Sequence, residues 1–291
     1  MSYIMHIITS TPVNSDPLQN IFHMASSSPK VWFITGASSG FGRAMTQLLL
    51  EKGDKVVATL RRPEVISDLR AKFSSDRLLI IKLDVTKPNE IQGAFLKAKE
   101  AFGRIDVVFN NAGFSAVAEV EGTSSEVARA LFETNFWGAV NVTTEAVKFF
   151  REVNKPVGGR LLQMSSMVGL TAAPGLGYYS ATKFALEAIS ESLAQELDPK
   201  WNIKASIEPA HPAYADQSLP AQQQRKWFSS NEIDGDISKA VVVMEKLAHL
   251  DEPPVRIPLH RLSILLARRK AERVQKETDE YELWSEDVYF G

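Results

Sequence analysis

The sequence predicts an α/β fold, namely a single domain built on a doubly wound, mostly parallel sheet of about seven strands with helices on both faces. Two observations predict it. Apolar β-type runs alternate with longer helical patterns from residue 31 onward, and this alternation implies parallel strands joined by right-handed helical crossovers. Several runs, such as Leu78–Ile81 and Val107–Phe109, are apolar throughout, as is typical of strands that are covered on both faces.

The elements follow from these runs in chain order. The predicted strands are Val31–Thr35, Val56–Leu60, Leu78–Leu83, Ile105–Asn110, Arg160–Ser165, Ile203–Glu208 and, as the last one, Val255–Pro258. Helical patterns fill the intervals at residues 41–52, 88–102, 124–153, 179–197 and 236–249. Pro199 follows Asp198 and ends the helix at 179–197, because the residue before a proline disfavours helical geometry.

Three segments depart from this alternation. Residues 1–29 are expected to form a flexible N-terminal extension, and residues 30–291 the domain itself. Residues 209–230 contain three prolines and a glutamine run and are expected to form a loop or lid over a site. Residues 259–291 begin as an amphipathic basic helix around Leu262–Val274 and end in an acidic, aromatic tail, which we expect to pack on the body or on a partner subunit.

The composition excludes several classes of function. The 291 residues are 44% apolar and carry a net charge of −2, which gives no reason to expect nucleic acid or an anionic membrane as a partner. There is no cysteine, and the five histidines form no His-x-x-x-His pair, so we expect no disulfide, no thiolate chemistry and no metal site. No apolar run is long enough to cross a bilayer, and residues 1–23 lack the Lys or Arg of a signal peptide. We therefore expect a cytoplasmic protein.

A glycine-rich turn follows the first predicted strand and reads Thr-Gly-Ala-Ser-Ser-Gly-Phe-Gly over residues 35–42. Gly36 permits the tight turn, Gly40 lets phosphates approach the backbone, and Gly42 lets the next helix lie close to the strand. The amide groups and the dipole at the start of that helix form an anion site. The sequence therefore predicts a Rossmann-like dinucleotide site. Its predicted contacts in the turn are Gly36, Ser38, Ser39, Gly40, Phe41 and Gly42.

Residues Gly36–Gly40 also match Gly-x-Ser-x-Gly, the nucleophile elbow of α/β-hydrolases. Ser38 would then be the nucleophile, and an acid and a histidine follow in the right order, for example Asp216 and His249. The elbow of a hydrolase normally comes after several strands, whereas this turn follows the first one. Dinucleotide binding is therefore the favoured interpretation.

The end of the second predicted strand indicates which nucleotide is bound. An acid that holds the ribose 2′-hydroxyl is expected there, but Leu60 occupies the position, and Arg61 and Arg62 follow. A guanidinium can pair with a 2′-phosphate through a charge-assisted hydrogen bond. The sequence therefore favours NADPH over NADH, with Arg61 as the contact.

A tyrosine and a lysine stand one helical turn apart in the stretch from Tyr179 to Lys183, and residues at i and i+4 share a helix face. An ammonium beside a phenol favours the phenolate and lowers its pKa from about 10. Tyr179 can then exchange a proton with an alcohol or a carbonyl near neutral pH. Most such pairs are surface neighbours, so the pair alone is weak evidence. Tyr178 has Thr182 at i+4 and is expected only to line a pocket.

Together these motifs resemble the short-chain dehydrogenase/reductase family. The likeness runs from about Lys30 to Glu208. In chain order it rests on Thr35-Gly36-x-x-x-Gly40-x-Gly42, Asn110-Asn111-Ala112-Gly113, Asn135, Ser166 and Tyr179-x-x-x-Lys183. Each motif alone is weak, but the ordered set is specific. The resemblance implies an NADPH-dependent oxidoreductase that interconverts a ketone or aldehyde and an alcohol by hydride transfer.

The resemblance also implies a role for each matching residue. Tyr179 is expected to be the acid/base, and Lys183 to hold the nicotinamide ribose and to lower the pKa of Tyr179. Ser166, thirteen residues before Tyr179, is expected to hydrogen-bond the reacting oxygen, and Asn135 to anchor a water that links Lys183 to solvent. Asn135 has an ordinary structural alternative as a turn or cap residue and Ser166 as a strand-end hydroxyl, while Asp84 could be a turn acid. The remaining cofactor contacts that the resemblance implies are Asp84, Val85, Asn111, Ala112, Gly113 and Pro209.

After the sixth predicted strand the chain departs from the family pattern, which usually reads Pro-Gly and then has a threonine that helps to hold the carboxamide. Here Ala210 replaces the glycine, and Tyr214 stands about where the threonine belongs. This altered loop favours a second interpretation, a non-catalytic NADPH-binding regulator on the same fold. The intact set of Ser166, Tyr179 and Lys183 favours the enzyme.

The predicted lid carries Leu219, Trp227 and Phe228, which favours an apolar or aromatic carbonyl or alcohol as the substrate. Members of the family commonly pair subunits through the helices that correspond to residues 124–153 and 179–197. The resemblance therefore implies a homodimer or a homotetramer.

Overall fold

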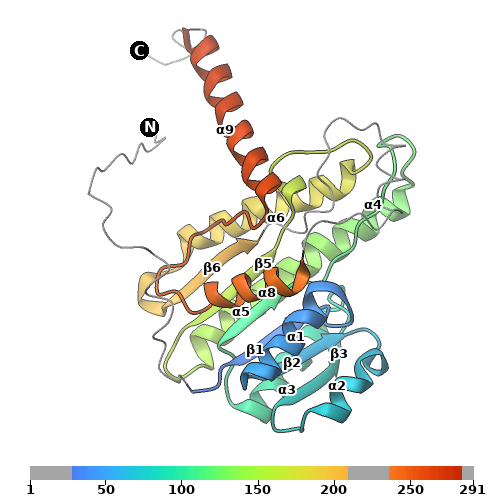
Figure 1. Ribbon diagram of the computed structural model, residues 1–291, viewed down its shortest axis with the longest axis vertical. Coiled ribbons are helices and arrows are strands. Elements are labelled where there is room, and N and C mark those ends of the chain that lie inside the picture. The colour runs from blue at the N-terminus through green and yellow to red at the C-terminus, as the bar shows by residue number, and fades with distance from the viewer. Residues whose placement is uncertain (1–27, 209–235, 284–291) are drawn as a thin grey trace.

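The computed structural model describes residues 28–208 and 236–283 (Figure 1). The predicted N-terminal extension lies outside these residues up to position 27, and the whole of the predicted lid lies outside them, including Pro209 and Tyr214. In the described part, helices cover both faces of a central parallel sheet. The predicted α/β fold class is confirmed.

Six strands form the sheet in the described part of the chain, and every neighbouring pair is parallel. They are β1 (Val31–Thr35), β2 (Lys55–Leu60), β3 (Leu78–Lys82), β4 (Val107–Asn110), β5 (Gly159–Met164) and β6 (Ile203–Glu208). Their order is β3-β2-β1-β4-β5-β6. The chain thus builds outward from β1 on one side, crosses back, and builds outward from β4 on the other. Ligands of doubly wound sheets bind where the order reverses, in the crevice beyond the carboxyl ends of β1 and β4.

The helices divide between the two faces of the sheet. One face carries α1 (Gly40–Lys52), α2 (Ser67–Lys72) and α8 (Ile237–Leu247). The other face carries α3 (Pro88–Phe102), α5 (Ala139–Glu152) and α6 (Gly177–Glu196). The remaining helical elements are the 3-10 turns Pro63–Ile66, Met167–Gly169 and Pro199–Trp201, helix α4 (Ser125–Phe132), the π-helical stretch Glu133–Gly138 and helix α9 (Arg261–Tyr281).

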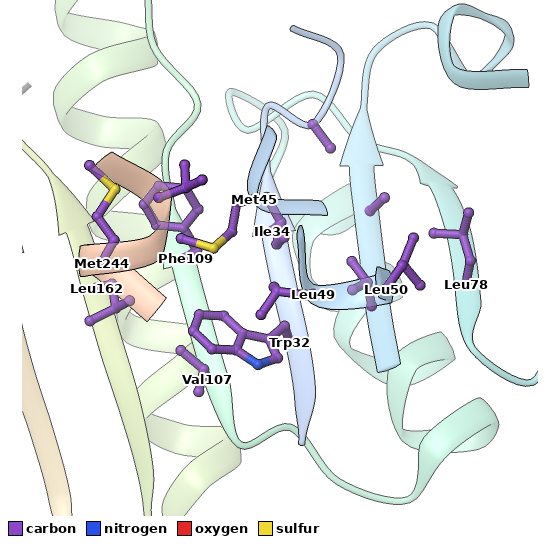
Figure 2. Close-up of a cluster of buried hydrophobic side chains, with 14 of the residues drawn as sticks. Trp32, Ile34, Met45, Leu49, Leu50, Leu78, Val107, Phe109, Leu162 and Met244 are labelled. Atoms are coloured by element: carbon purple, nitrogen blue, oxygen red, sulfur yellow. The ribbon is translucent and has the colours of Figure 1, made fainter. Parts of the chain in front are cut away.

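Strand β1 explains why the predicted runs are apolar throughout. Its alternate residues Trp32 and Ile34 face α1 and lie among Leu49 and the other side chains of the first core cluster (Figure 2). Phe33 points to the opposite face, where its ring stacks on that of Phe95 at 4.3 Å between centroids. The side chains named here, from Trp32 to Phe95, are each at most 1% exposed, and burying each contributes about 1.5–3 kcal/mol. This packing fixes the register that brings the strand ends together.

One prediction of secondary structure is wrong, and another is correct but incomplete. Val255–Pro258 is not a strand, because the segment is irregular apart from a single bridge residue, Arg256. The prolines at 253, 254 and 258 remove the backbone donors that a ladder needs. The predicted helix over 124–153 is continuous but not uniform, since α4 passes through the π-helical stretch Glu133–Gly138 before α5 begins.

Helix α9 is longer than predicted and projects from the body of the molecule (Figure 1). Near its start Leu266 is only 3% exposed and contributes to a core cluster, whereas every residue from Ala271 to Leu283 is exposed. Packing on the body is therefore confined to its first turns. No helix in the described ranges combines the length and the apolar character that crossing a membrane requires.

Candidate active site

The glycine-rich turn carries the chain from β1 into α1 with little space between them. Gly36 has a φ of +69°, a conformation that favours glycine. A Cβ atom on Gly42 would lie 2.3 Å from the Gly36 carbonyl oxygen and 2.7 Å from Asn111 Nδ2, so only glycine fits there. Ser39, at the N-cap of α1, makes no capping hydrogen bond, and the first turn has no acidic side chain. The amide groups and the positive end of this helix are therefore suited to an anion.

Hydrogen bonds fasten the turn after β1 to the turn after β4. Thr35 Oγ1 accepts from the backbone N–H groups of Asn111 and Ala112, both at 2.9 Å. The Asn111 side chain donates from Nδ2 to the Thr35 carbonyl oxygen at 2.9 Å. The two turns that flank the crevice are thereby held as one rigid wall. Thr35 takes this role although sequence reasoning assigned it none.

A cavity of about 340 Å³ lies over these turns. It contains most of the predicted cofactor contacts, and they come from the ends of four strands. Those that line it are Gly36, Ser38, Ser39, Gly40, Phe41, Arg61, Asp84, Val85, Asn111, Ala112 and Gly113. Five further residues line the cavity although the sequence predicted no cofactor contact for them, and they are Leu60, Leu83, Thr86, Phe114 and Thr134. Each of them stands next to a predicted contact or to Asn135, so adjacency was the only available signal.

Arg61 and Asp84 lie along this cavity, beyond the ends of β2 and β3. Arg61 is exposed. The buried side chain of Leu60 lines the cavity at the position where an acid would hold the ribose 2′-hydroxyl. Burial raises the pKa of Asp84, but hydrogen bonds from Thr86 and the positive charges of Arg61 and Lys87 outweigh it and hold that pKa below its ordinary value. Asp84 is therefore an ionised acceptor at neutral pH, and Arg61 is an exposed cation beside it.

Asn135 lies in the π-helical stretch, and such stretches are frequent at functional sites. Its side chain is buried. Oδ1 accepts from the Phe114 N–H at 2.9 Å, while Nδ2 donates to the Phe114 carbonyl at 2.7 Å and to Thr182 Oγ1 at 3.3 Å. Asn135 therefore ties the loop after β4 to helix α6. These hydrogen bonds go to Phe114 and Thr182, so the predicted role of Asn135 in linking Lys183 to solvent stays a prediction.

Helix α6 presents Tyr179 and Lys183 on one buried face. The Lys183 amine donates to the Met164 carbonyl at 2.7 Å and lies 5.9 Å from the centre of the Tyr179 ring. Tyr179 is 8% exposed and Lys183 is 4% exposed. Burial lowers the pKa of Lys183 to about 8, an effect that the negative charge of Glu187 partly offsets. The amine is thus a buried cation that loses its proton just above neutral pH.

Ser166 stands two residues beyond the end of β5 and begins the 3-10 turn Met167–Gly169. It is fully buried, and its Oγ accepts from the Val168 N–H at 3.4 Å. The same turn packs with Leu176 and Tyr179 in an apolar cluster. A reacting group beside Tyr179 would therefore meet apolar walls and few competing hydrogen-bond donors.

The cavity and the Tyr179–Lys183 pair belong to one continuous site. A Cβ atom on Gly113, which lines the cavity, would lie 3.0 Å from Asn135 Oδ1 and 3.8 Å from Lys183 Nζ. The structure thus brings together residues from positions 36 to 183 that sequence reasoning selected separately. Tyr178 instead lines a separate hollow with Arg129 and Trp137. Pro209 lies outside the described residues.

The geometry excludes the proposed Ser38–His249 pair of a hydrolase. His249 Nε2 lies 2.9 Å from Glu245 Oε1, and Glu245 Oε2 lies 2.6 Å from Nζ of Lys52, the last residue of α1. Ser38 precedes the first residue of the same helix, whose 13 residues span about 18 Å at about 1.5 Å per residue. Among the described residues there is also no group of three or more metal-ligating side chains.

Comparisons with known proteins identify the family of this chain. A family model described as short chain dehydrogenase matches residues 30–219. An uncharacterized oxidoreductase of Schizosaccharomyces pombe is 35% identical over 84% of this chain and 87% of its own length. The oxidoreductase calM of Penicillium decumbens is 35% identical over 89% of this chain and 91% of its own.

A solved structure shows the same architecture. The short-chain dehydrogenase from Streptomyces avermitilis superposes with a TM-score of 0.81 and 31% identity, covering 91% of this chain and all of that one. The ordered motifs, the fold and these relatives agree. The chain therefore belongs to the short-chain dehydrogenase/reductase family of oxidoreductases.

Proposed function

We propose that the protein is an NADPH-dependent oxidoreductase that interconverts a ketone or aldehyde and an alcohol, with Tyr179 as the acid/base. The observation that carries this proposal is the buried Lys183 amine, which lies 5.9 Å from the centre of the Tyr179 ring and beside the wall of the cavity at the glycine-rich turn. A cation at this place stabilises the phenolate form of Tyr179. Tyr179 is then acidic enough to give its proton to a carbonyl oxygen, or to take it back from an alcohol.

The residues of the cavity fit NADPH. The Gly36 turn leaves space that a Cβ atom would fill against Ala112 and Asn111, and the start of α1 suits a pyrophosphate. Asp84 is an ionised acceptor for the adenine end. Arg61 supplies the cation for a 2′-phosphate, since no acid competes at Leu60. When bound, the nicotinamide supplies or accepts the hydride.

Other side chains of the site bind the substrate oxygen, keep a cation near Tyr179 and hold the cavity beside the Tyr179–Lys183 pair. The Ser166 hydroxyl donates a hydrogen bond to the substrate oxygen as negative charge develops on it. Lys183 holds its charge near Tyr179 while its amine stays fixed on the Met164 carbonyl. Asn135 keeps the loop after β4 in register with α6 and so holds the cavity and the pair together. The apolar cluster around Met167, Leu176 and Tyr179 favours an apolar or aromatic substrate.

Substitution of Tyr179 by Phe tests the proposal. We expect Y179F to lose turnover by about 100- to 10,000-fold, because general acid catalysis contributes about 10²–10⁴-fold, while NADPH binding measured by fluorescence stays within about twofold. Tyr178→Phe removes the same hydroxyl one residue earlier and serves as the matched control. Turnover by Y179F at a rate near that of the control would remove Tyr179 from the mechanism.

A non-catalytic NADPH-binding regulator is the second candidate, and its support is the departure from the family pattern at Ala210 and Tyr214. Both candidates predict NADPH binding, but only the enzyme consumes NADPH. A panel of apolar and aromatic ketones and aldehydes, followed at the absorbance of NADPH, separates them. NADPH binding without consumption across the panel would favour the regulator.

The oligomeric state is part of the proposal. Helices α5 and α6 leave a hollow between them that is lined by Val147, Leu193 and Ile189 among others, and Trp137 and Phe184 nearby in sequence are 50% and 39% exposed. We expect these helices to pair two copies in a homodimer or homotetramer. Light scattering that shows a monomer at micromolar concentration would contradict this.

A further inference from the structure

A buried carboxylate lies one helical turn beyond Lys183. Glu187 follows Lys183 at i+4 on α6, and only 5% of the residue is exposed. Burying an isolated carboxylate costs far more than burying a neutral group. The proton transfer proposed above does not use Glu187, so its position needs another explanation.

The contacts of Glu187 leave its charge only partly compensated. Oε2 accepts from Nε of Arg256 at 2.8 Å, and Arg256 also reaches Oε2 of Glu191 at 3.4 Å from Nη2. The second carboxylate oxygen, Oε1, is buried and has no hydrogen-bond partner among the described residues. Arg256 stands 69 positions later, in the segment that leads into α9. One oxygen of Glu187 is therefore anchored from outside the helix, and the other stays available to a neighbouring cation.

The turn that carries Ser166 closes directly on this part of α6. A Cβ atom on Gly169 would lie 3.2 Å from Cγ of Glu187, 3.3 Å from the carbonyl carbon of Lys183 and 2.8 Å from Oγ of Ser165. Bulk solvent is thereby kept away from Glu187 and Lys183. Charges that are shielded from water interact more strongly than charges on the surface.

The electrostatics of Lys183 also indicate an interaction with Glu187. Burial lowers the pKa of Lys183 to about 8, and the opposing effect that raises it comes from Glu187. The other titratable groups that face the pair are Tyr179 on α6 itself, Glu191 one turn further along, and Arg256 from the segment before α9. Of these, Arg256 weakens the field of Glu187 at Lys183, because it shares the same carboxylate.

We propose that Glu187 is a positioning residue that keeps the Lys183 amine in its charged form, and that Arg256 both anchors Glu187 and limits its effect. The link to turnover rests on the proposed function, whereas the electrostatic coupling between Glu187 and Lys183 does not. In this arrangement the C-terminal segment of the domain helps to set the pH range in which Tyr179 has its cation.

The pH profile of kcat/KM tests the proposal kinetically. Glu187→Gln keeps the size of the side chain and removes its charge, so the basic limb that reports Lys183 should move to lower pH by about one pH unit. Arg256→Gln leaves Glu187 charged but uncompensated, so the limb should move to higher pH. Glu191→Gln is the matched control, because it makes the same change one turn further along α6 on a side chain that is 56% exposed, and its limb should stay in place. An E187Q limb that coincides with the natural one would overturn the proposal, even if kcat fell.

A second experiment needs no substrate. The free energy of unfolding is measured against pH for the natural chain, K183M, E187Q and the double variant. The difference between chains with and without Lys183 should change over a lower pH range when Gln occupies position 187. Identical ranges in both backgrounds would overturn the coupling whatever the protein catalyses. A shifted range together with no NADPH consumption would instead contradict the proposed function and leave the coupling intact.

If E187Q does not fold, two other variants test the proposal. Glu187→Asp keeps the charge, so the basic limb of its kcat/KM profile must stay at the natural pH. R256Q must still move that limb to higher pH, and failure of either result overturns the proposal.

Discussion

Replacement of Lys183 by Met should reveal the cost of keeping a cation inside this protein. The ordinary pKa of a lysine is 10.5, and burial lowers that of Lys183 to about 8. At about 1.36 kcal/mol per pH unit, this difference destabilises the folded protein by about 3 kcal/mol at pH 7. The cost is present in full below pH 8, where both states carry the proton, and it disappears above pH 10.5, where neither does.

Methionine removes this cost but also removes the hydrogen bond from the Lys183 amine to the Met164 carbonyl. Leaving that buried carbonyl without a partner costs about 1–3 kcal/mol. At pH 7 the two effects nearly cancel, so K183M should differ little from the natural chain in stability. Their pH dependence does not cancel, because only the charge effect changes between pH 8 and 10.5.

The assay is urea unfolding at several values of pH, without nucleotide. The natural chain should gain about 3 kcal/mol of stability relative to K183M as the pH rises from 7 to 10.5, since the unfolded chain binds the extra proton in that range. Lys97→Met, at an exposed lysine on α3, is the control and should show a constant difference from the natural chain. A constant difference for K183M as well would refute the argument that burial perturbs this amine.

Three further predictions follow from the site. R61D should reduce the preference for NADPH over NADH by about 10- to 100-fold in the ratio of kcat/KM values, because a charge-assisted bond to the 2′-phosphate is lost; an unchanged ratio would mean that Arg61 does not select the nucleotide. G42A should lower the free energy of unfolding by about 1–3 kcal/mol, since its Cβ would overlap the Gly36 carbonyl oxygen, and a natural Tm in this variant would contradict the close approach. N135A should cost about 1–3 kcal/mol in thermal unfolding, because the buried Asn135 amide is lost together with its hydrogen bonds to the N–H and C=O groups of Phe114; a loss below about 0.5 kcal/mol would show that these bonds contribute little.

The central strands β1, β2 and β4 were predictable because each is a short run buried on both faces. Trp32 and Phe33 point to opposite faces of the sheet and are both fully buried, so β1 could not be mistaken for a half-exposed strand. Helix α2 was not predicted, since the stretch from Arg61 to Lys72 is short and mostly polar and its amphipathic signal is weak. The predicted strand at Val255–Pro258 does not form, because the two prolines before it and Pro258 within it outweigh its apolar character.

The residues of the candidate site that could be predicted are those whose type is required by the local backbone or by their spacing in the sequence. The glycines of the 35–42 turn and the Tyr179–Lys183 spacing follow from backbone geometry and helix periodicity. The contacts of Asn135 with Phe114 and of Glu187 with Arg256 join residues far apart in the chain. No periodic pattern encodes such pairs, because tertiary packing alone decides them.

A crystal structure of the complex with NADPH tests the central claim most directly. The account predicts the pyrophosphate at the start of α1, the 2′-phosphate at Arg61, and the nicotinamide ring beside the Tyr179 hydroxyl with the Lys183 amine near the ribose. A nucleotide bound elsewhere, or a Tyr179 hydroxyl that faces away from the nicotinamide, would contradict it.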